Sequence, residues 1–348
     1  MSLVLPQTQW PNADRSMWEA VFAKGDLLDG QGPMGHVRQT TQTSLEQRYG
    51  RWLEWLRVNE PHALDLPPSQ RATLDRFKAW LIVLDHTAPM TRLAFVDGVL
   101  RVLMAANPER DWSAHRTLCA RLKKQAGRGA QTHKHGRVLS SIVLLDAGLN
   151  LALVAADEAR SSIWRAIHIR DGAIIALLAL LPIRRRALVG LRIGESIFFN
   201  DNTATLALSA SLTKSGVPWE SEIPGAVMPA LNRYLQDARP FLLERGAMRH
   251  DALWVDRKGS PLGYSAVAPA VKNGTERMLG ICISPHLFRD AAATTLARHS
   301  SRAATLIRPV LSHSSDRTAE RHYNHANTIE AGREYAALLA TLKEGQTR

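Results

Sequence analysis

Hydrophobic positions recur with helical spacing through the first third of the chain. From residue 41 onward, apolar side chains lie three or four positions apart in three successive runs, which is the spacing of a buried helix face. The runs are Leu45, Tyr49, Trp52, Leu53 and Leu56, then Leu74, Phe77, Leu81 and Leu84, and then Leu93, Val96, Val99, Leu100 and Leu103. The pattern predicts a compact helical domain over residues 41–122.

The segments on either side of this domain lack such periodicity. Residues 1–40 are interrupted by Pro6, Pro11, Gly25, Gly30, Gly32, Pro33 and Gly35, which is typical of a flexible or peripheral arm. After the helical runs, "LKKQAGRGAQTHKHGR" (122–137) is poor in apolar residues and rich in lysine, arginine and glycine. We interpret residues 123–137 as an interdomain linker that lies on or near phosphates, with a merely solvated linker as the alternative.

Residues 138–348 form the second expected domain, in which helical patterns resume with one break. In "SIFFNDNTATLALSASLTKSGVPWESEIP" (196–224), residues that favour β-structure flank "NDN" and "KSG", two sequences suited to hairpin turns. The break predicts a small antiparallel sheet with Lys214 at its second turn. The fold expected from the pattern is therefore mainly α with a small antiparallel β-sheet.

Charge and composition indicate what kind of molecule the protein binds and in which compartment it is found. The 348 residues include 44 Lys and Arg against 32 Asp and Glu, for a net charge of +12, which favours a polyanion such as nucleic acid over a merely basic surface. Cys119 and Cys282 suit neither a disulfide framework nor a zinc site, so a reducing compartment is expected. The opening residues show no secretory signal, and the apolar run 173–183 is too short to span a bilayer. We expect a cytoplasmic protein.

Four polar clusters carry candidate chemistry: "PIRRRALVGLRIGES" (182–196), "LTKSG" (212–216), "SPHLFRDAAATTLA" (284–297) and "LSHSSDRTAERHYNHA" (311–326). If Pro285 starts a helix, His286 and Arg289 share one face of its first turn, where the helix dipole favours a phosphate. Taken singly, each cluster is weak. An arginine triplet is usually a solvated surface, and a tyrosine such as Tyr323 on a polar stretch usually packs half-buried.

The order and spacing of the four clusters resemble the catalytic domain of the tyrosine recombinase (phage integrase) family, over roughly residues 140–330. "PHLFRDAAATTLA" resembles the HxxR box of that family, "LSHSSDRTAERHY" its LGHSS box and nucleophilic tyrosine, and "LTKSG" its β-hairpin lysine. Residues 41–122 are similar to the helical core-binding domain that precedes it. The resemblance implies a DNA-binding core-binding domain followed by a mixed α+β tyrosine-recombinase catalytic domain over 138–348.

The resemblance also implies a role for each site residue. Tyr323 would attack the scissile phosphate, and Lys214 would give a proton to the departing 5′ oxygen. Arg184 and Arg289 would hold the nonbridging oxygens, while His286 and His313 would supply hydrogen bonds and proton transfer. No metal or other cofactor is expected, because the sequence shows neither a carboxylate cluster nor a Gly-rich loop ending in Lys-Ser or Lys-Thr.

Two positions depart from the family pattern. The family often has "GLRISE" at its first arginine, whereas "PIRRRA" has Ala187 where an acidic residue usually stands, and a competing "GLRIGE" with Arg192 follows. We choose Arg184 because "LVGLRIGES" then falls where the family has an apolar segment and an acidic residue before the first strand. The second departure is Ser312 in place of the usual glycine, which matters only if that backbone needs positive φ.

The function implied by the resemblance is a site-specific DNA recombinase or integrase of a mobile element, with double-stranded DNA as partner. Residues 327–342 have the spacing of a capped amphipathic helix, which packs on its own domain or, as is common in the family, on a neighbouring protomer. The resemblance, and not these residues, implies a homotetramer in the synaptic complex, with accessory recombination proteins as possible partners. Two alternatives stay open: a type IB topoisomerase-like enzyme that relaxes DNA, and a non-catalytic DNA-binding accessory protein.

Overall fold

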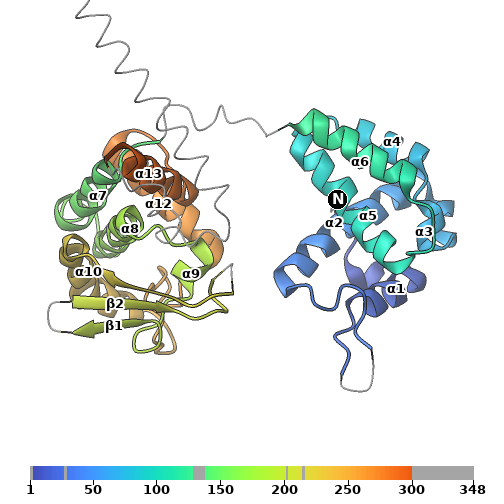
Figure 1. The fold of residues 1–348 in the computed structure, drawn as a ribbon. Coiled ribbons are helices and arrows are strands. Elements are labelled where there is room, and N and C mark those ends of the chain that lie inside the picture. Colours follow the sequence, from blue (N-terminus) through green and yellow to red (C-terminus); the bar gives the residue numbers. More distant parts are fainter. Residues whose placement is uncertain (1–2, 27–29, 128–137, 201–202, 214–215, 300–348) are drawn as a thin grey trace, which may run out of the picture. The chain divides into compact units, whose positions relative to one another are not determined.

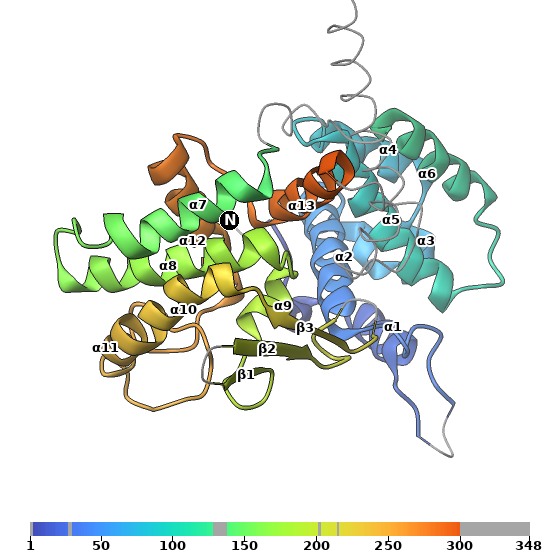
Figure 2. The same cartoon turned by 60° about the vertical axis from the view of Figure 1, so that its left-hand side comes forward.

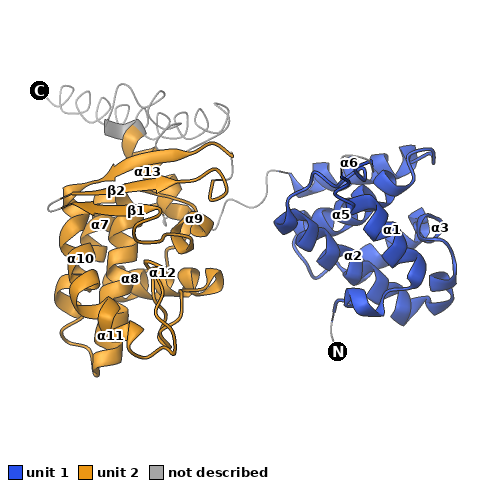
Figure 3. Cartoon of the chain, turned by 90° about the horizontal axis from the view of Figure 1, so that it is seen from below, with its two compact units in different colours: residues 1–131 blue, residues 132–348 orange. Residues whose placement is uncertain are grey.

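The chain divides into two compact units, residues 1–131 and 132–348, each with its own hydrophobic core (Figure 3). The computed structural model describes residues 3–26, 30–127, 138–200, 203–213 and 216–299. The predicted fold is confirmed, because helices make up most of the described chain and the strands form one small antiparallel sheet (Figure 1).

The first unit is helical. Its core is formed by the apolar faces expected from the sequence; for example, Trp52, Leu53, Phe77 and Val99 are all fully buried. Its elements are η1 (Gln7–Gln9), α1 (Asn12–Phe22), α2 (Gln39–Asn59), η2 (Pro61–Asp65), α3 (Pro68–Arg71), α4 (Leu74–Val83), α5 (Pro89–Ala106) and α6 (Ser113–Ala126).

The expectation of a flexible arm over residues 1–40 is wrong for its described part. Helix α1 packs against α5, and its Asp14 and Trp18 are buried in the core of the unit. The Asp14 carboxylate accepts hydrogen bonds from Tyr49 Oη at 2.6 Å and from Arg71 Nη1 at 2.5 Å. Tyr49 and Arg71, which are 35 and 57 positions from Asp14, thus hold α1 in place. The local pattern of prolines and glycines carries no information about such distant partners.

The expected linker also begins later than its predicted start at residue 123. Helix α6 continues through Lys123 and Lys124 to Ala126, and Gly127, with a φ of 56°, ends it. Lysines in the last turn of a helix favour its continuation, because their charge complements the negative end of the helix dipole. Residues 128–137 lie outside the described residues.

The second unit is arranged around α8, which is buried along most of its length (Figure 2). Helix α8 (Ser162–Leu180) contacts α7 (Ser141–Asn150), α10 (Met228–Arg233), α11 (Arg239–Leu243), α12 (Tyr264–Leu279) and α13 (Pro285–His299). The remaining helical elements are the π-helices η4 (Leu151–Ala155) and η6 (Tyr234–Ala238), the 3-10 helix η5 (Gly225–Val227) and α9 (Arg185–Val189). None of the helices in the described residues is long and apolar enough to cross a membrane.

Two glycines allow α7 and α8 to pack closely. A Cβ atom on Gly148 would lie 2.5 Å from the backbone nitrogen of Ala176, and one on Gly172 would lie 2.5 Å from that of Ala152. These distances are shorter than any normal contact, so a larger residue at either position would push the helices apart. The close packing fixes α8, whose end leads into the segment that carries Arg184.

The sheet has the order β1–β2–β3, with β1 (Ile197–Asn200), β2 (Thr203–Leu208) and β3 (Trp219–Ile223), all antiparallel. Alternate residues of β2 are buried, and Leu206 pairs with the buried Ile197 while Ala204 pairs with the buried Ile223. One face of the sheet therefore packs on the helical core. The predicted antiparallel sheet is confirmed, while Lys214 at its second turn lies outside the described residues.

Candidate active site

Helix α13, which carries His286 and Arg289, is fixed at both its entry and its far end. Gly280, in the left-handed conformation at φ 69°, ends α12 and turns the chain. The backbone N–H of Ile283 then donates to Thr275 Oγ1 at 2.9 Å, which ties the turn to α12. Farther along α13, Thr295 Oγ1 accepts from the backbone N–H of Ser141 at 3.0 Å. As predicted, Pro285 is the first residue of α13.

Arg289 is almost completely buried, with 6% of its surface exposed. Its Nη1 atom donates to the carbonyl oxygen of Pro182 at 2.5 Å. Pro182 lies in the short segment between α8 and α9, two residues before Arg184. A side chain of α13 therefore holds the backbone that leads to the other candidate arginine.

Arg184 lies immediately before α9 and is half-buried. Its positive charge influences the pKa of Arg289. Burial lowers the pKa of Arg184. Burial, together with the nearby charge of Arg184, lowers the pKa of Arg289 to about 10, against a smaller opposing effect of Asp290. Two partly desolvated guanidinium groups that repel each other are stabilised by an anion between them, and a phosphodiester has the oxygens to accept from both.

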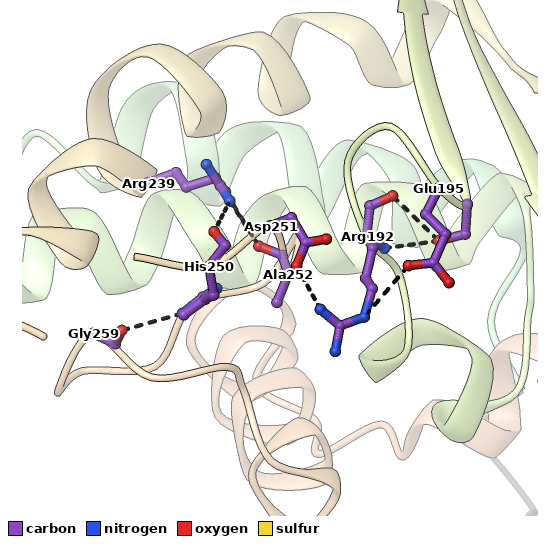
Figure 4. A network of polar contacts seen from close by, with 8 residues as sticks. Arg192, Glu195, Arg239, His250, Asp251, Ala252 and Gly259 are labelled. Carbon is purple, nitrogen blue, oxygen red and sulfur yellow. Dashed lines mark hydrogen bonds and ion pairs between the residues drawn. The ribbon is translucent and has the colours of Figure 1, made fainter. Parts of the chain in front are cut away.

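Arg192, the competing arginine, takes part in a different network (Figure 4). Its Nη1 atom lies 2.5 Å from Asp251 Oδ1, and its Nε atom lies 3.7 Å from Glu195 Oε2. Its backbone N–H also donates to Ser196 Oγ at 2.7 Å. Arg192 thus joins the start of β1 to the segment after α11, and two carboxylates already neutralise its charge.

The other predicted site residues are placed as follows. His286 is exposed in the first turn of α13. Lys214, His313 and Tyr323 lie outside the described residues, as does Ser312. Within the described ranges, no group of three or more His, Cys, Asp or Glu side chains could hold a metal ion.

One contact near Arg184 could not be expected from the sequence. The guanidinium of Arg185, the next residue, lies over the ring of Tyr264 at 4.3 Å from its centroid. Arg185 belongs to the arginine triplet 184–186, which by itself indicates only a solvated surface. Its partner Tyr264 is 79 positions away, so no local pattern joins the two residues. The only local signal for Tyr264 is its place after Gly263, where a helix starts.

Comparison with known proteins identifies the family. The model of the phage integrase family matches residues 149–330, which is more than half of the chain. The range contains most of the described part of the second unit, from the end of α7 to α13, and includes Arg184 and Arg289. The chain belongs to the phage integrase family.

Solved structures share the fold at low sequence identity. A transposon integrase, Tn1549, in complex with transposon right end DNA has a TM-score of 0.54 and 14% identity, over 87% of this chain and 95% of that one. The XerH site-specific recombinase bound to its difH substrate has a TM-score of 0.53 and 15% identity, over 84% of this chain and 79% of that one. No curated protein matches this sequence.

Proposed function

We propose that the protein is a tyrosine-type site-specific DNA recombinase that cuts and rejoins duplex DNA on behalf of a mobile element. The observation that carries the proposal is the pair formed by Arg184 and Arg289. Both are partly desolvated, each belongs to a motif of the family, and together they form a site for a phosphate. The net charge of +12 agrees with DNA as the partner. We also propose a cytoplasmic location, where the protein would meet the DNA of the cell.

The reaction needs no external energy source. Tyr323 Oη attacks the scissile phosphorus and becomes joined to the 3′ side of the break, while the 5′ oxygen leaves with a proton from Lys214. Arg184 and Arg289 neutralise the charge that develops on the nonbridging oxygens, and His286 and His313 assist by hydrogen bonding and proton transfer. A 5′ hydroxyl of the partner duplex then attacks the phosphotyrosine and gives up its proton, which restores a phosphodiester, breaks the bond between phosphorus and Tyr323 Oη, and regenerates the tyrosine hydroxyl.

Among the two candidate arginines, the electrostatics favour Arg184. Burial and, to a smaller extent, the charge of Arg184 lower the pKa of Arg289, so the charge of Arg184 acts at Arg289, whereas Arg192 is paired with Asp251. Strand exchange between two duplexes requires four cleavages, so we further propose a homotetramer in the synaptic complex. The two structural neighbours, an integrase and a recombinase that were each solved in complex with DNA, agree with this assignment.

The test starts from DNA that the protein itself selects. Genomic fragments retained by the purified protein are sequenced, and the recovered site is placed on two plasmids of different size. We expect recombinant molecules that join the two plasmids at this site. Relaxation of supercoils without joined products would instead indicate a topoisomerase-like enzyme, and binding without any strand break would indicate an accessory protein.

A further inference from the structure

Arg185 and Tyr264 form a pair beside the candidate active site. Besides the stacking of the guanidinium on the ring, Arg185 Nη2 donates to Tyr264 Oη at 3.0 Å. Arg185 is the first residue of α9, and Tyr264 is the first residue of α12. The pair therefore joins the starts of two helices that are far apart in the sequence.

Helix α9 depends on contacts with the rest of the second unit to keep its place. It is only five residues long, which is too short for a helix to be stable by itself. Ala187 and Leu188 anchor its buried side, but the acidic residue that the family often has at position 187 is replaced by an alanine buried in the core. An alanine methyl group cannot accept a hydrogen bond from a guanidinium, so residue 187 gives Arg184 no such support. The chain neighbours of Arg184 are another means of fixing its place.

Those neighbours are held on both sides of Arg184. On one side, Arg289 binds the carbonyl oxygen of Pro182. On the other side, Arg185 stacks on Tyr264, a residue that is 52% exposed and so is poorly explained as part of the core. An exposed stacked pair contributes little to folding. It ties the end of the Arg185 side chain to the start of α12, one residue along the chain from Arg184.

We propose that Tyr264 is a positioning residue for Arg184: by holding Arg185, it keeps the Arg184 guanidinium where it meets the nonbridging oxygens of a phosphate. The inference rests on the proposed function and names a residue that supports its phosphate site. A displacement of about 1 Å at such a group costs up to roughly a hundredfold in rate, so the pair can matter greatly for cleavage while mattering little for stability.

The first arm of the test needs no DNA cleavage. Inorganic phosphate is titrated into the full-length protein while the Nε–Hε signal of Arg184, assigned with Arg184→Lys, is followed by NMR. We expect Tyr264→Ala to weaken phosphate binding at Arg184 at least about fivefold and Tyr264→Phe, which keeps the ring, to weaken it less than twofold. Phosphate that does not shift the Arg184 signal of the wild-type protein, or that binds Tyr264→Ala equally well, overturns the inference.

The second arm measures covalent capture of a nicked DNA substrate and separates rate from affinity. Tyr264→Ala should lower the rate at saturating DNA about tenfold to a hundredfold, with the dissociation constant for DNA changed less than about threefold. A substrate with a methylphosphonate at the scissile position lacks the charge that Arg184 neutralises, so on it Tyr264→Ala and wild type should differ little. A wild-type rate for Tyr264→Ala on normal DNA contradicts the inference.

Trp164→Ala is the matched control. Trp164 is also an exposed aromatic residue, with Arg257 5.9 Å from its ring centroid, but it lies in the first turn of α8, at the other end of that helix from Arg184. It should change neither phosphate binding nor the capture rate. If the wild-type protein captures no DNA although phosphate binds Arg184 more weakly in Tyr264→Ala, the proposed function is wrong and the positioning role stands.

Discussion

Arg289 of α13 donates a hydrogen bond to the carbonyl oxygen of Pro182, a residue 107 positions earlier in the chain. The bond joins the helix that carries the HxxR motif to the segment that presents Arg184. The bond thus fixes Arg289 in relation to the backbone two residues before Arg184. Such preorganisation is what electrostatic stabilisation of a transition state requires.

The choice between Arg184 and Arg192 leads to a first prediction. Arg184→Ala should lower the rate of DNA cleavage about 10²-fold to 10³-fold, because it removes one donor to the nonbridging oxygens. The dissociation constant for DNA should change little, since the other basic residues still attract the phosphates of the DNA backbone. The measurement is single-turnover cleavage at saturating DNA, with a filter-binding titration beside it.

Arg192→Ala is the matched comparison. Its ion pair with Asp251 is about half exposed, so its loss should cost less than about 1 kcal/mol of stability and leave cleavage within a fewfold of wild type. The opposite ranking of the two variants would show that Arg192 is the phosphate ligand.

The N-terminal helix leads to a second prediction. Asp14→Ala should lower the free energy of unfolding of the first unit by about 3–5 kcal/mol, because it leaves the buried Arg71 without its counter-ion. Urea unfolding followed by tryptophan fluorescence measures the change. Glu19→Ala, an exposed position on the same helix, should be close to wild type. Equal stability of Asp14→Ala and Glu19→Ala would contradict the role of α1 as part of the core.

His115 leads to a third prediction, about pH. Its Nε2 atom lies 2.7 Å from the carbonyl oxygen of Ala72 and must donate to it, while Nδ1 is buried with no hydrogen-bond partner among the described residues. Burial lowers the pKa of His115, so the folded state disfavours its charged form. Stability is therefore full above about pH 6.5, the ordinary value for histidine, and falls as the pH drops toward the lowered pKa.

The variant His115→Gln keeps a donor for Ala72 but does not titrate. Its urea midpoint should fall less than that of wild type between pH 7.5 and 5, a range of about 2.5 units that spans the ordinary pKa of histidine. The exposed His62, changed to glutamine, should leave the wild-type pH dependence intact. If the urea midpoints of wild type and His115→Gln fall equally with pH, protonation of His115 does not contribute to the pH dependence of stability.

Local patterns in the sequence account for much of this fold. The spacing of Tyr49, Trp52 and Leu56 predicts a buried helix face, and alternation with turn residues predicts the sheet, because both depend on residues that are near each other in the chain. The core role of α1 could not be predicted, since the partners of Asp14 on α2 and α3 lie far along the chain.

The candidate site shows the same division. Arg184 and Arg289 could be named from their motifs, whereas the hydrogen bond between Arg289 and Pro182 depends on how α13 packs against α8. The pair of Arg185 and Tyr264 was missed for the same reason. Side chains that support a site act through contacts in space, and no short motif records them.

Lys214 leads to a fourth prediction. Lys214→Ala should slow cleavage of normal DNA by about 10²-fold to 10⁴-fold, the usual contribution of a general acid. A substrate with sulfur at the 5′-bridging position has a leaving group that needs no proton, so the variant should cleave it at nearly the wild-type rate. Lys258→Ala, a loop lysine of the same unit, serves as control. If the sulfur substrate does not restore the cleavage rate of Lys214→Ala, Lys214 would act as a phosphate ligand and not as the general acid.

In the proposed reaction, Tyr323 becomes covalently joined to DNA. A nicked substrate carrying the selected site loses a short 5′-hydroxyl fragment on cleavage, which prevents religation and traps the intermediate. If Tyr323 is the nucleophile, we expect an adduct that survives boiling in detergent, maps by peptide mass to Tyr323, and is absent from Tyr323→Phe, which loses one oxygen and still binds DNA. An adduct that persists in Tyr323→Phe, or that maps to Tyr335, would contradict it.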